Sequence, residues 1–310
     1  MILVVTPNLA WDVTYAVDRL VPHRTHRVRS VRGRAGGKGV NVARVLGRLG
    51  RRAVVAGLAG GRTGELIRQD LLDSGIDADI AAVREESRRT VAVVSTADGE
   101  ATLFNEPGPV VGPAEWTGFR EAVLARIPEA SAVVLTGSLP PGVPDDSKVP
   151  FIHRATASGV PCIVDTSGPA LRHAVKSRPA LVKPNAEELR ELTSRPDPLR
   201  AAVDLRDEHG VDVVVSLGAE GLVAAIGRGV WRARPGEPVR GNPTGAGDAV
   251  VAALVSGHVD GTPWPHRLAE AVAISAAAVA APVAGEFDAD EYRRQRDTVR
   301  VHPPEVLDGT

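Results

Sequence analysis

Short apolar runs alternate along the chain with longer stretches in which apolar residues recur every three or four positions. The runs are rich in β-branched residues and predict strands buried on both faces at Ala53–Leu58, Ala132–Thr136, Val160–Asp165, Ala180–Val182 and Val211–Leu217. The stretches between them predict helices over Lys38–Leu49, Thr63–Ser74, Pro113–Ile127, Asp145–Ser158 and Leu199–His209. This alternation favours an α/β fold, with a doubly wound, mainly parallel sheet and helices on both faces.

Two segments interrupt the alternation. Val13–Arg34 and Arg89–Asn105 show extended, partly polar patterns with no helix between the runs, and a turn at Ala97–Glu100 predicts a hairpin in the second. We expect the two segments to pair as a small β-layer beside the main sheet. The alternative, two exposed loops, fits their length less well.

The C-terminal part of the chain differs in composition. Ala246–Ser256 and Arg267–Ala281 predict two helices rich in small residues that can pack closely, and His302-Pro303-Pro304 predicts the start of a terminal tail. No linker, low-complexity run or internal repeat is visible, so we expect residues 1–310 to form one domain.

Charge and cysteine content exclude several classes of protein. The formal net charge of −1 over 310 residues argues against a partner that is a nucleic acid or a membrane surface. The single cysteine, Cys162, excludes an internal disulfide or a cysteine-based metal site and lies in an apolar run typical of a core. Met1–Thr6 does not resemble a signal peptide and Ala271–Ala281 is too short to span a membrane, so we expect a cytoplasmic protein.

Lysine is scarce in this chain. Of the 37 basic residues, 33 are arginines and only four are lysines, namely Lys38, Lys148, Lys176 and Lys183. A preference for arginine over lysine is typical of proteins from a genome of biased base composition, so a single arginine is weak evidence of a functional role. A lysine in such a chain is stronger evidence.

Two glycine-rich segments precede predicted helices. Gly241–Ala249 places an acid, Asp248, in the first helical turn after small residues, a pattern that suits anion binding by backbone N–H groups and equally suits simple helix capping. Gly36–Asn41 has Gly39 where a P-loop needs Ser or Thr after the lysine, so that motif is excluded. Since no GxGxxG motif follows the first strand, a dehydrogenase is disfavoured as well.

The two segments resemble the paired signatures of the ribokinase/phosphofructokinase-B family of carbohydrate kinases. Further blocks similar to those of the family follow in family order, at Asn8–Asp12, Gly60–Gly64, Asn105–Pro109, Gly137–Gly142, Asp165–Gly168, Lys183–Leu189 and Ser216–Gly221. Several of them are most similar to the 1-phosphofructokinase and tagatose-6-phosphate kinase branch. The resemblance implies a ribokinase-like fold with a lid built from residues 13–34 and 89–105.

The resemblance also implies an activity. It is transfer of the γ-phosphoryl group from ATP, with Mg²⁺, to a hydroxyl group of a phosphorylated ketohexose such as fructose 1-phosphate, tagatose 6-phosphate or fructose 6-phosphate. It further implies a homodimer that forms through the lid.

Roles for individual residues follow from the same resemblance. Asp248 is expected to be the catalytic base, with an anion hole formed by Gly245, Ala246 and Gly247. The expected acceptor ligands are Asp12, Gly37, Lys38, Asn41, Arg89 and Ser138. The nucleotide is expected at Lys183, Asn185, Ser216, Gly218, Glu220, Gly221 and Gly247, with the helix Arg267–Ala281 over the adenine. Asn185 and Glu188 are expected to order hydrated Mg²⁺, although the pair also has the spacing of a helix capping box.

Two departures from the family pattern leave alternatives open. Val91 replaces a polar residue typical of the branch, which leaves the identity of the acceptor open, and Asn242 replaces a frequent aspartate, which leaves activation by a monovalent cation open. A kinase for an unphosphorylated sugar or a nucleoside is one alternative. A non-catalytic sugar-phosphate sensor on the same fold is the other.

Overall fold

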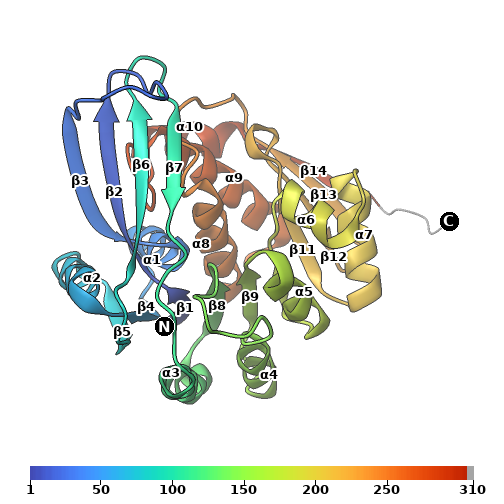
Figure 1. Ribbon diagram of the computed structural model, residues 1–310. Coiled ribbons are helices and arrows are strands. Elements are labelled where there is room, and N and C mark those ends of the chain that lie inside the picture. The colour runs from blue at the N-terminus through green and yellow to red at the C-terminus, as the bar shows by residue number, and fades with distance from the viewer. Residues whose placement is uncertain (306–310) are drawn as a thin grey trace.

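A large sheet runs through the centre of the molecule (Figure 1). Within residues 1–305, the part of the chain that the computed structural model describes, it has ten strands in the order β14-β13-β12-β11-β10-β9-β8-β1-β4-β5. Their bounds are β1 Ile2–Asn8, β4 Ala53–Ala59, β5 Asp77–Ala82, β8 Ala132–Thr136, β9 Cys162–Asp165, β10 Leu181–Val182, β11 Asp212–Ser216, β12 Leu222–Ile226, β13 Gly229–Arg234 and β14 Arg300–Glu305. In this spatial order, the seven strands from β11 to β5 pair in parallel, and β12, β13 and β14 are added to β11 by antiparallel pairing. The mainly parallel sheet is thus confirmed.

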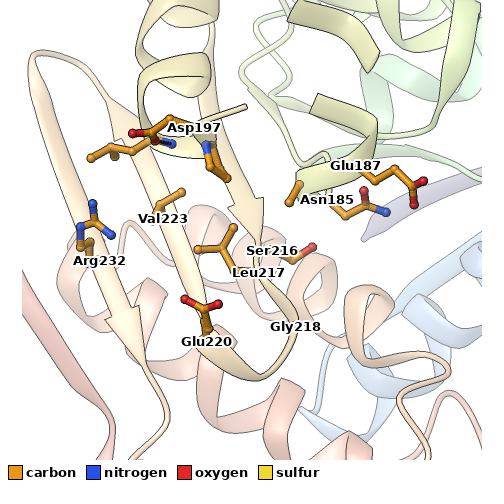
Figure 2. A pocket seen from close by; sticks show the side chains of 12 residues that line it. Asn185, Glu187, Asp197, Ser216, Leu217, Gly218, Glu220, Val223 and Arg232 are labelled. Atoms are coloured by element: carbon orange, nitrogen blue, oxygen red, sulfur yellow. Dashed lines mark hydrogen bonds between the residues drawn. The ribbon is translucent and has the colours of Figure 1, made fainter. Parts of the chain in front are cut away.

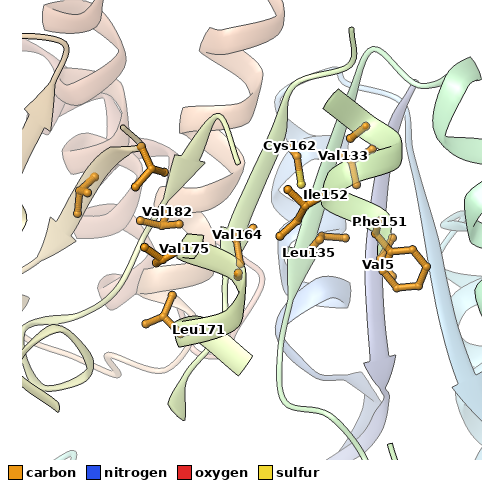
Figure 3. Packing of buried hydrophobic residues seen from close by; sticks show 14 of the residues in the cluster. Val5, Val133, Leu135, Phe151, Ile152, Cys162, Val164, Leu171, Val175 and Val182 are labelled. Atoms are coloured by element: carbon orange, nitrogen blue, oxygen red, sulfur yellow. The ribbon is translucent and has the colours of Figure 1, made fainter. Parts of the chain in front are cut away.

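Helices cover both faces of this sheet because its strands are apolar on both sides. In β1, Leu3 and Val5 enter one core and Ile2 and Val4 enter the other. The first core takes up α3 Pro113–Arg126, α4 Val149–Ala157, α5 Gly168–Lys176, α6 Ala186–Thr193 and α7 Pro198–His209, and Figure 3 shows part of it. The second takes up α1 Lys38–Arg48, α8 Ala246–Val259 and α9 Trp264–Ala280.

The remaining helices and the cysteine complete this packing. Helix α2, Gly61–Asp73, buries Ile67 and Leu71 in a third core with β4, and α10, Ala289–Thr298, packs on α9. Single 3₁₀ turns lie at Ile127–Glu129 and Gly218–Glu220. Cys162 is buried in the first core, where burial raises the pKa of its thiol to about 12, so the prediction of a core residue is confirmed.

A second, smaller sheet stands apart from the first. Within the described part of the chain it has four strands in the order β3-β2-β6-β7, with bounds β2 Ala10–Val17, β3 Ser30–Gly36, β6 Arg88–Ser95 and β7 Ala101–Asn105. The central pair β2 and β6 is parallel, and the outer strands pair with it antiparallel. The predicted β-layer is thus confirmed, and its first strand begins at Ala10, directly after β1.

Two predictions of local structure are wrong. His302 does not start a tail, because it lies in β14 and pairs with Arg232 of β13; prolines are tolerated there since β14 is an edge strand. The part of the predicted tail from residue 306 on lies outside the described residues. Helix α4 begins at Val149 rather than at Asp145, since Pro150 is acceptable only in the first helical turn.

The topology creates a crevice at one edge of the large sheet. The chain moves outward from β1 to β4 and β5 on one side, and from β8 through β9 and β10 to β11 on the other. Ligands of such sheets bind beyond the carboxyl ends of the strands where the order reverses. Asp165 ends β9, Lys183 follows β10 and Ser216 ends β11, so three polar residues gather at this edge. Among residues 1–305, no helix combines the length and apolar character needed to cross a membrane.

Candidate active site

A cavity of about 970 Å³ lies between the carboxyl edge of the large sheet, the small sheet and helices α8 and α9. It brings together most of the residues singled out from the sequence, namely Asp12, Gly37, Lys38, Asn41, Lys183, Asn185, Glu188, Ser216, Gly218, Gly221, Gly245, Ala246, Gly247 and Asp248. Three predicted residues, Arg89, Ser138 and Glu220, are absent from its described lining.

The N-terminus of α8 points a carboxylate and backbone amides at this cavity. Gly245 caps the helix with φ of +86°, a left-handed conformation that glycine adopts without strain, and a Cβ there would lie 2.8 Å from the Cβ of Ala284. The N–H of Ala246 donates to the oxygen of Pro243 at 3.1 Å, whereas within residues 1–305 no backbone acceptor is found for the N–H of Gly247. A helix start with such an amide and a favourable dipole suits an anion.

Asp248 lies in the first turn of α8 and is only 6% exposed. Its Oδ2 accepts a hydrogen bond of 2.8 Å from Nδ2 of Asn41, which is buried on α1. Burial raises the pKa of Asp248 to about 7, although the positive charge of Lys38 opposes the shift. A carboxyl group with that pKa is suited to exchange protons near neutral pH.

Two ammonium groups share one buried carboxylate at the end of β9. Asp165 is 1% exposed, and its oxygens lie 3.1 Å from Nζ of Lys183 and 3.3 Å from Nζ of Lys38. Thr136 donates to the same carboxylate at 3.1 Å. Although burial acts in the opposite direction, the two lysines lower the pKa of Asp165 to about 2, so it is ionised at neutral pH.

The ammonium groups lie close to the amide-rich end of α8. A Cβ built on Gly247 would lie 3.7 Å from Nζ of Lys183, so Lys183 stands beside the first turn of that helix. The pKa of Lys38 is raised, chiefly by the charge of Asp165, which keeps Lys38 protonated. The cavity therefore offers two fixed positive charges next to a helix N-terminus, which suits a phosphate group.

The small sheet contributes the wall opposite α8. Asp12 of β2 fits against Gly36, where a Cβ would lie 1.9 Å from the carboxylate, so only glycine leaves room for this side chain. Burial raises the pKa of Asp12 despite the nearby guanidinium groups of Arg88 and Arg34. Arg88 and Thr90 of β6 also line the cavity.

The register of the small sheet separates the two adjacent arginines of β6. Asp12 pairs with Thr90 and Trp11 pairs with Arg89, so Arg89 lies on the face opposite to Asp12. Arg88 lines the cavity and donates to the backbone oxygen of Asn8 at 3.2 Å, whereas Arg89 is exposed. The structure therefore directs Arg88 toward the cavity, where the resemblance had suggested Arg89.

One face of α9 forms an apolar wall of the cavity. Val272, Ser275, Ala276 and Val279 lie at spacings of three and four residues and line it together. On the other side lie Ser216, Gly218 and Gly221.

A smaller cavity of about 480 Å³ flanks the same loop. Figure 2 shows that Glu220 lies here with Arg232 and Asp197, while Asn185, Ser216 and Gly218 line both cavities. Glu220 thus lies near the predicted nucleotide site but belongs to the neighbouring cavity.

Asn185 and Glu188 form the start of α6. Oδ1 of Asn185 accepts from the N–H of Glu188 at 2.8 Å, and Oε2 of Glu188 accepts from the N–H of Asn185 at 2.9 Å. This capping box uses one oxygen of each side chain and leaves Oε1 of Glu188 without a protein donor in the described residues. Since both residues line the cavity, oxygen ligands remain for a cation that keeps most of its water, as Mg²⁺ does.

Two further predicted positions lie at the edge of the site. Oγ of Ser138 accepts a hydrogen bond of 3.1 Å from Nδ2 of Asn8, which fixes this side chain beside the end of β8. Oδ1 of Asn242 accepts from the N–H of Thr244 at 3.0 Å, so one lone pair of this oxygen is already used.

Sequence reasoning missed two charged residues that line the cavity, Asp165 and Arg88, and a third, Lys148, that lies behind it. Asp165 stood in a motif quoted for its resemblance, but nothing in the sequence shows that it binds two lysines. Arg88 could have been found from the period-two pattern of β6 once its register with Asp12 was known. Lys148 was marked only by the scarcity of lysine, and it is buried close behind the site.

The comparisons with known proteins agree with this geometry. Residues 3–290 match the model of the family described as "pfkB family carbohydrate kinase". Phosphofructokinase-2 from Escherichia coli, in a complex with potassium, is similar over 96% of this chain and 98% of its own, at 29% identity and a TM-score of 0.87. The same enzyme has also been solved with fructose-6-phosphate and in a tetrameric inhibited form.

A second solved protein is similar over nearly the same length. It is described as a "possible 1-phosphofructokinase" from Thermotoga maritima and covers 97% of this chain and 98% of its own, at 25% identity and a TM-score of 0.87.

Proposed function

The chain belongs to the pfkB family of carbohydrate kinases, and on that premise we propose that it transfers the γ-phosphoryl group of ATP to a hydroxyl group of a phosphorylated ketohexose. The observation that carries this proposal is the single cavity in which Asp248, the first turn of α8 and two lysines face the acidic and basic residues of the small sheet. ATP and Mg²⁺ are the expected co-substrate and metal, and we place the reaction in the cytoplasm.

Asp248 is the group that takes the proton of the acceptor hydroxyl. Its carboxylate is the one at the start of α8, and Asn41 fixes its orientation through the 2.8 Å hydrogen bond. A pKa of about 7 matches a general base that works near neutral pH and can release the proton afterwards. Asp12, on the opposite wall, is placed to accept hydrogen bonds from other sugar hydroxyl groups.

Phosphoryl transfer depends mainly on positioning and on compensation of negative charge. The amide of Gly247 and the ammonium groups of Lys38 and Lys183 supply positive charge at the same place in the cavity. Asn185 and Glu188 would hold hydrated Mg²⁺, which when bound neutralises charge on the phosphates of ATP. The apolar face of α9 suits the adenine ring.

A phosphate group on the acceptor finds a partner in Arg88. This guanidinium lies on the cavity side of β6, two residues from Thr90 and close to Asp12. Arginine binds phosphate in a bidentate manner, so we assign recognition of the acceptor phosphate to Arg88.

Release of ADP from Mg-ATP tests the proposal across fructose 1-phosphate, fructose 6-phosphate, tagatose 6-phosphate, fructose, ribose and adenosine. We expect turnover with a phosphosugar, and loss of turnover with Asp248→Ala. Preference for a free sugar or a nucleoside would keep the kinase and overturn the assignment of Arg88. Thermal stabilisation by phosphosugars with no ADP release from any acceptor would favour the sensor instead.

We further propose that the chain forms a homodimer through the outer face of the small sheet. The register places Val13, Tyr15, Val31, Val91 and Phe104 on the face that points away from the cavity. Val31 of β3 is 62% and Phe104 of β7 is 56% exposed, so large apolar side chains are exposed on both outer strands of this one sheet face. A monomer measured by light scattering at micromolar concentration would refute this proposal.

A further inference from the structure

Lys148 is a buried lysine that the proposed mechanism does not use. It is 2% exposed and lies at the N-cap of α4, and its Nζ donates to the carbonyl oxygen of Gly137 at 3.2 Å. Burial disfavours its charge and Lys38 adds repulsion, while the nearby charge of Asp165 offsets these effects only in part. A lysine buried against such a net penalty needs a reason for its presence.

The carbonyl group that Lys148 contacts belongs to a turn at the end of β8. Gly137 has φ of +79°, and its oxygen accepts a second hydrogen bond, of 2.9 Å, from Oγ1 of Thr166. Its N–H donates to the oxygen of Asp165 at 3.1 Å. Ser138, the next residue, is held by Asn8. Residues from several elements therefore hold the turn, and the side chains of Lys148 and Thr166 both donate to the carbonyl oxygen of Gly137.

We propose that Lys148 is a positioning residue that holds the Gly137–Ser138 turn in the conformation that binds the acceptor. The inference rests on the proposed function, because it takes Ser138, which Asn8 holds at the edge of the site, as the acceptor ligand that the family resemblance implies. Lys148 itself does not reach the large cavity, since it is not among the residues that line it. It acts on the acceptor through the backbone of Gly137.

The choice of lysine supports this role. The chain uses arginine at 33 of its 37 basic positions, yet a lysine stands here. A slender stem with a single terminal nitrogen can reach one carbonyl oxygen from within the core, whereas a guanidinium carries further N–H groups that would need partners in the same buried space. Three of the four lysines thus lie around Asp165 and the Gly137–Ser138 turn, namely Lys38, Lys148 and Lys183.

The test separates the KM of the acceptor from the KM of ATP. In Lys148→Met, which keeps an unbranched side chain and removes the charged terminal nitrogen, we expect the acceptor KM to rise by about tenfold while the ATP KM stays within about twofold. Thr166→Val removes the other donor to the same oxygen and should raise the acceptor KM in the same way. Lys176→Met, at the exposed fourth lysine, is the matched control and should change neither constant.

A pH profile adds a readout that a purely structural role would not move. Burial and Lys38 lower the pKa of Lys148 to about 8, so the wild-type acceptor KM should rise above that pH and the Lys148→Met value should not. The titratable groups that face Lys148 are Lys38 of α1 and Asp165 and Cys162 of β9. None of these titrates near pH 8, because the pKa of Asp165 is about 2, that of Cys162 about 12, and that of Lys38 is raised.

The outcomes distinguish this inference from the proposed function. An unchanged acceptor KM in both Lys148→Met and Thr166→Val, with an increase in Ser138→Ala, would overturn the inference and leave the function intact. Absence of turnover by the wild-type protein with every phosphosugar would instead overturn the proposed function. Equal increases in the KM of acceptor and ATP would also refute the inference, because they would show a general loss of structure.

Discussion

The buried carboxyl group of Asp248 makes stability and activity depend on the same proton. Its pKa is about 7 in the folded protein and about 3.9 in an unfolded chain. Between pH 5 and pH 6 the folded protein keeps this proton while the unfolded chain has lost it, and near pH 7 about half of the folded molecules have lost it too. The free energy of unfolding therefore falls with rising pH by up to about 1.4 kcal/mol per unit, or about 2 kcal/mol from pH 5 to pH 7.

Asp248→Asn removes this titration and keeps the shape of the side chain. Measured by urea unfolding, the stability of the variant relative to wild type should increase by about 2 kcal/mol from pH 5 to pH 7 and level off above pH 8. The variant should also lose on the order of 10² to 10⁴ in kcat, since it lacks the base. In the wild-type protein, kcat/KM should rise with pH and level off above about pH 7.

Asp165→Asn is the matched control for this experiment. Its carboxylate is also buried, but its pKa is about 2, so it is ionised in both the folded and the unfolded chain above pH 5. Loss of the Asp165 charge lowers the pKa of Asp248, so the stability of Asp165→Asn relative to wild type should rise from pH 5 to pH 8 by less than that of Asp248→Asn. A constant difference between Asp248→Asn and wild type would show an ordinary pKa at position 248 and refute the reasoning.

Three other predictions concern the acceptor, the metal and the assembly. Arg88→Ala should raise the acceptor KM by at least about tenfold, and Arg89→Ala should raise it less, as measured by steady-state kinetics. Glu188→Gln keeps the capping box but should raise the Mg²⁺ concentration for half-maximal rate by about tenfold in a metal titration. Phe104→Asp should convert a dimer to a monomer in light scattering; a dimer that persists would place the interface elsewhere.

The main sheet and its helices could be predicted because their strands are buried on both faces. Such strands, of which Ala132–Thr136 is an example, stand out as continuous apolar runs regardless of their neighbours. The edge strand β14 could not be predicted in this way. Its sequence contains two prolines and few apolar residues, and only the open edge of β13 makes it a strand. Its conformation depends on a distant partner rather than on local pattern.

The same distinction applies to the candidate site. Asp248, Gly245 and Asn41 carry local signals, because glycines and polar groups at a helix start point to a bound anion. The side of the small sheet on which Arg88 or Arg89 lies depends on the register between β2 and β6, far apart in the sequence. The contacts of Asp165 with Lys38 and Lys183 depend on three separate elements meeting at one edge of the sheet.

The charges of the site explain one another. Without a phosphate in the cavity, Lys38 and Lys183 would be two positive charges close together, and Asp165 offsets their repulsion. Because Thr136 and both lysines bind this carboxylate, it stays ionised although it is almost fully buried. An arriving phosphate meets ammonium groups already fixed in place, so little reorganisation accompanies its binding. The negative charge of Asp165 also helps to keep the pKa of Asp248 high, and a proton held near neutral pH is what a reversible general base requires.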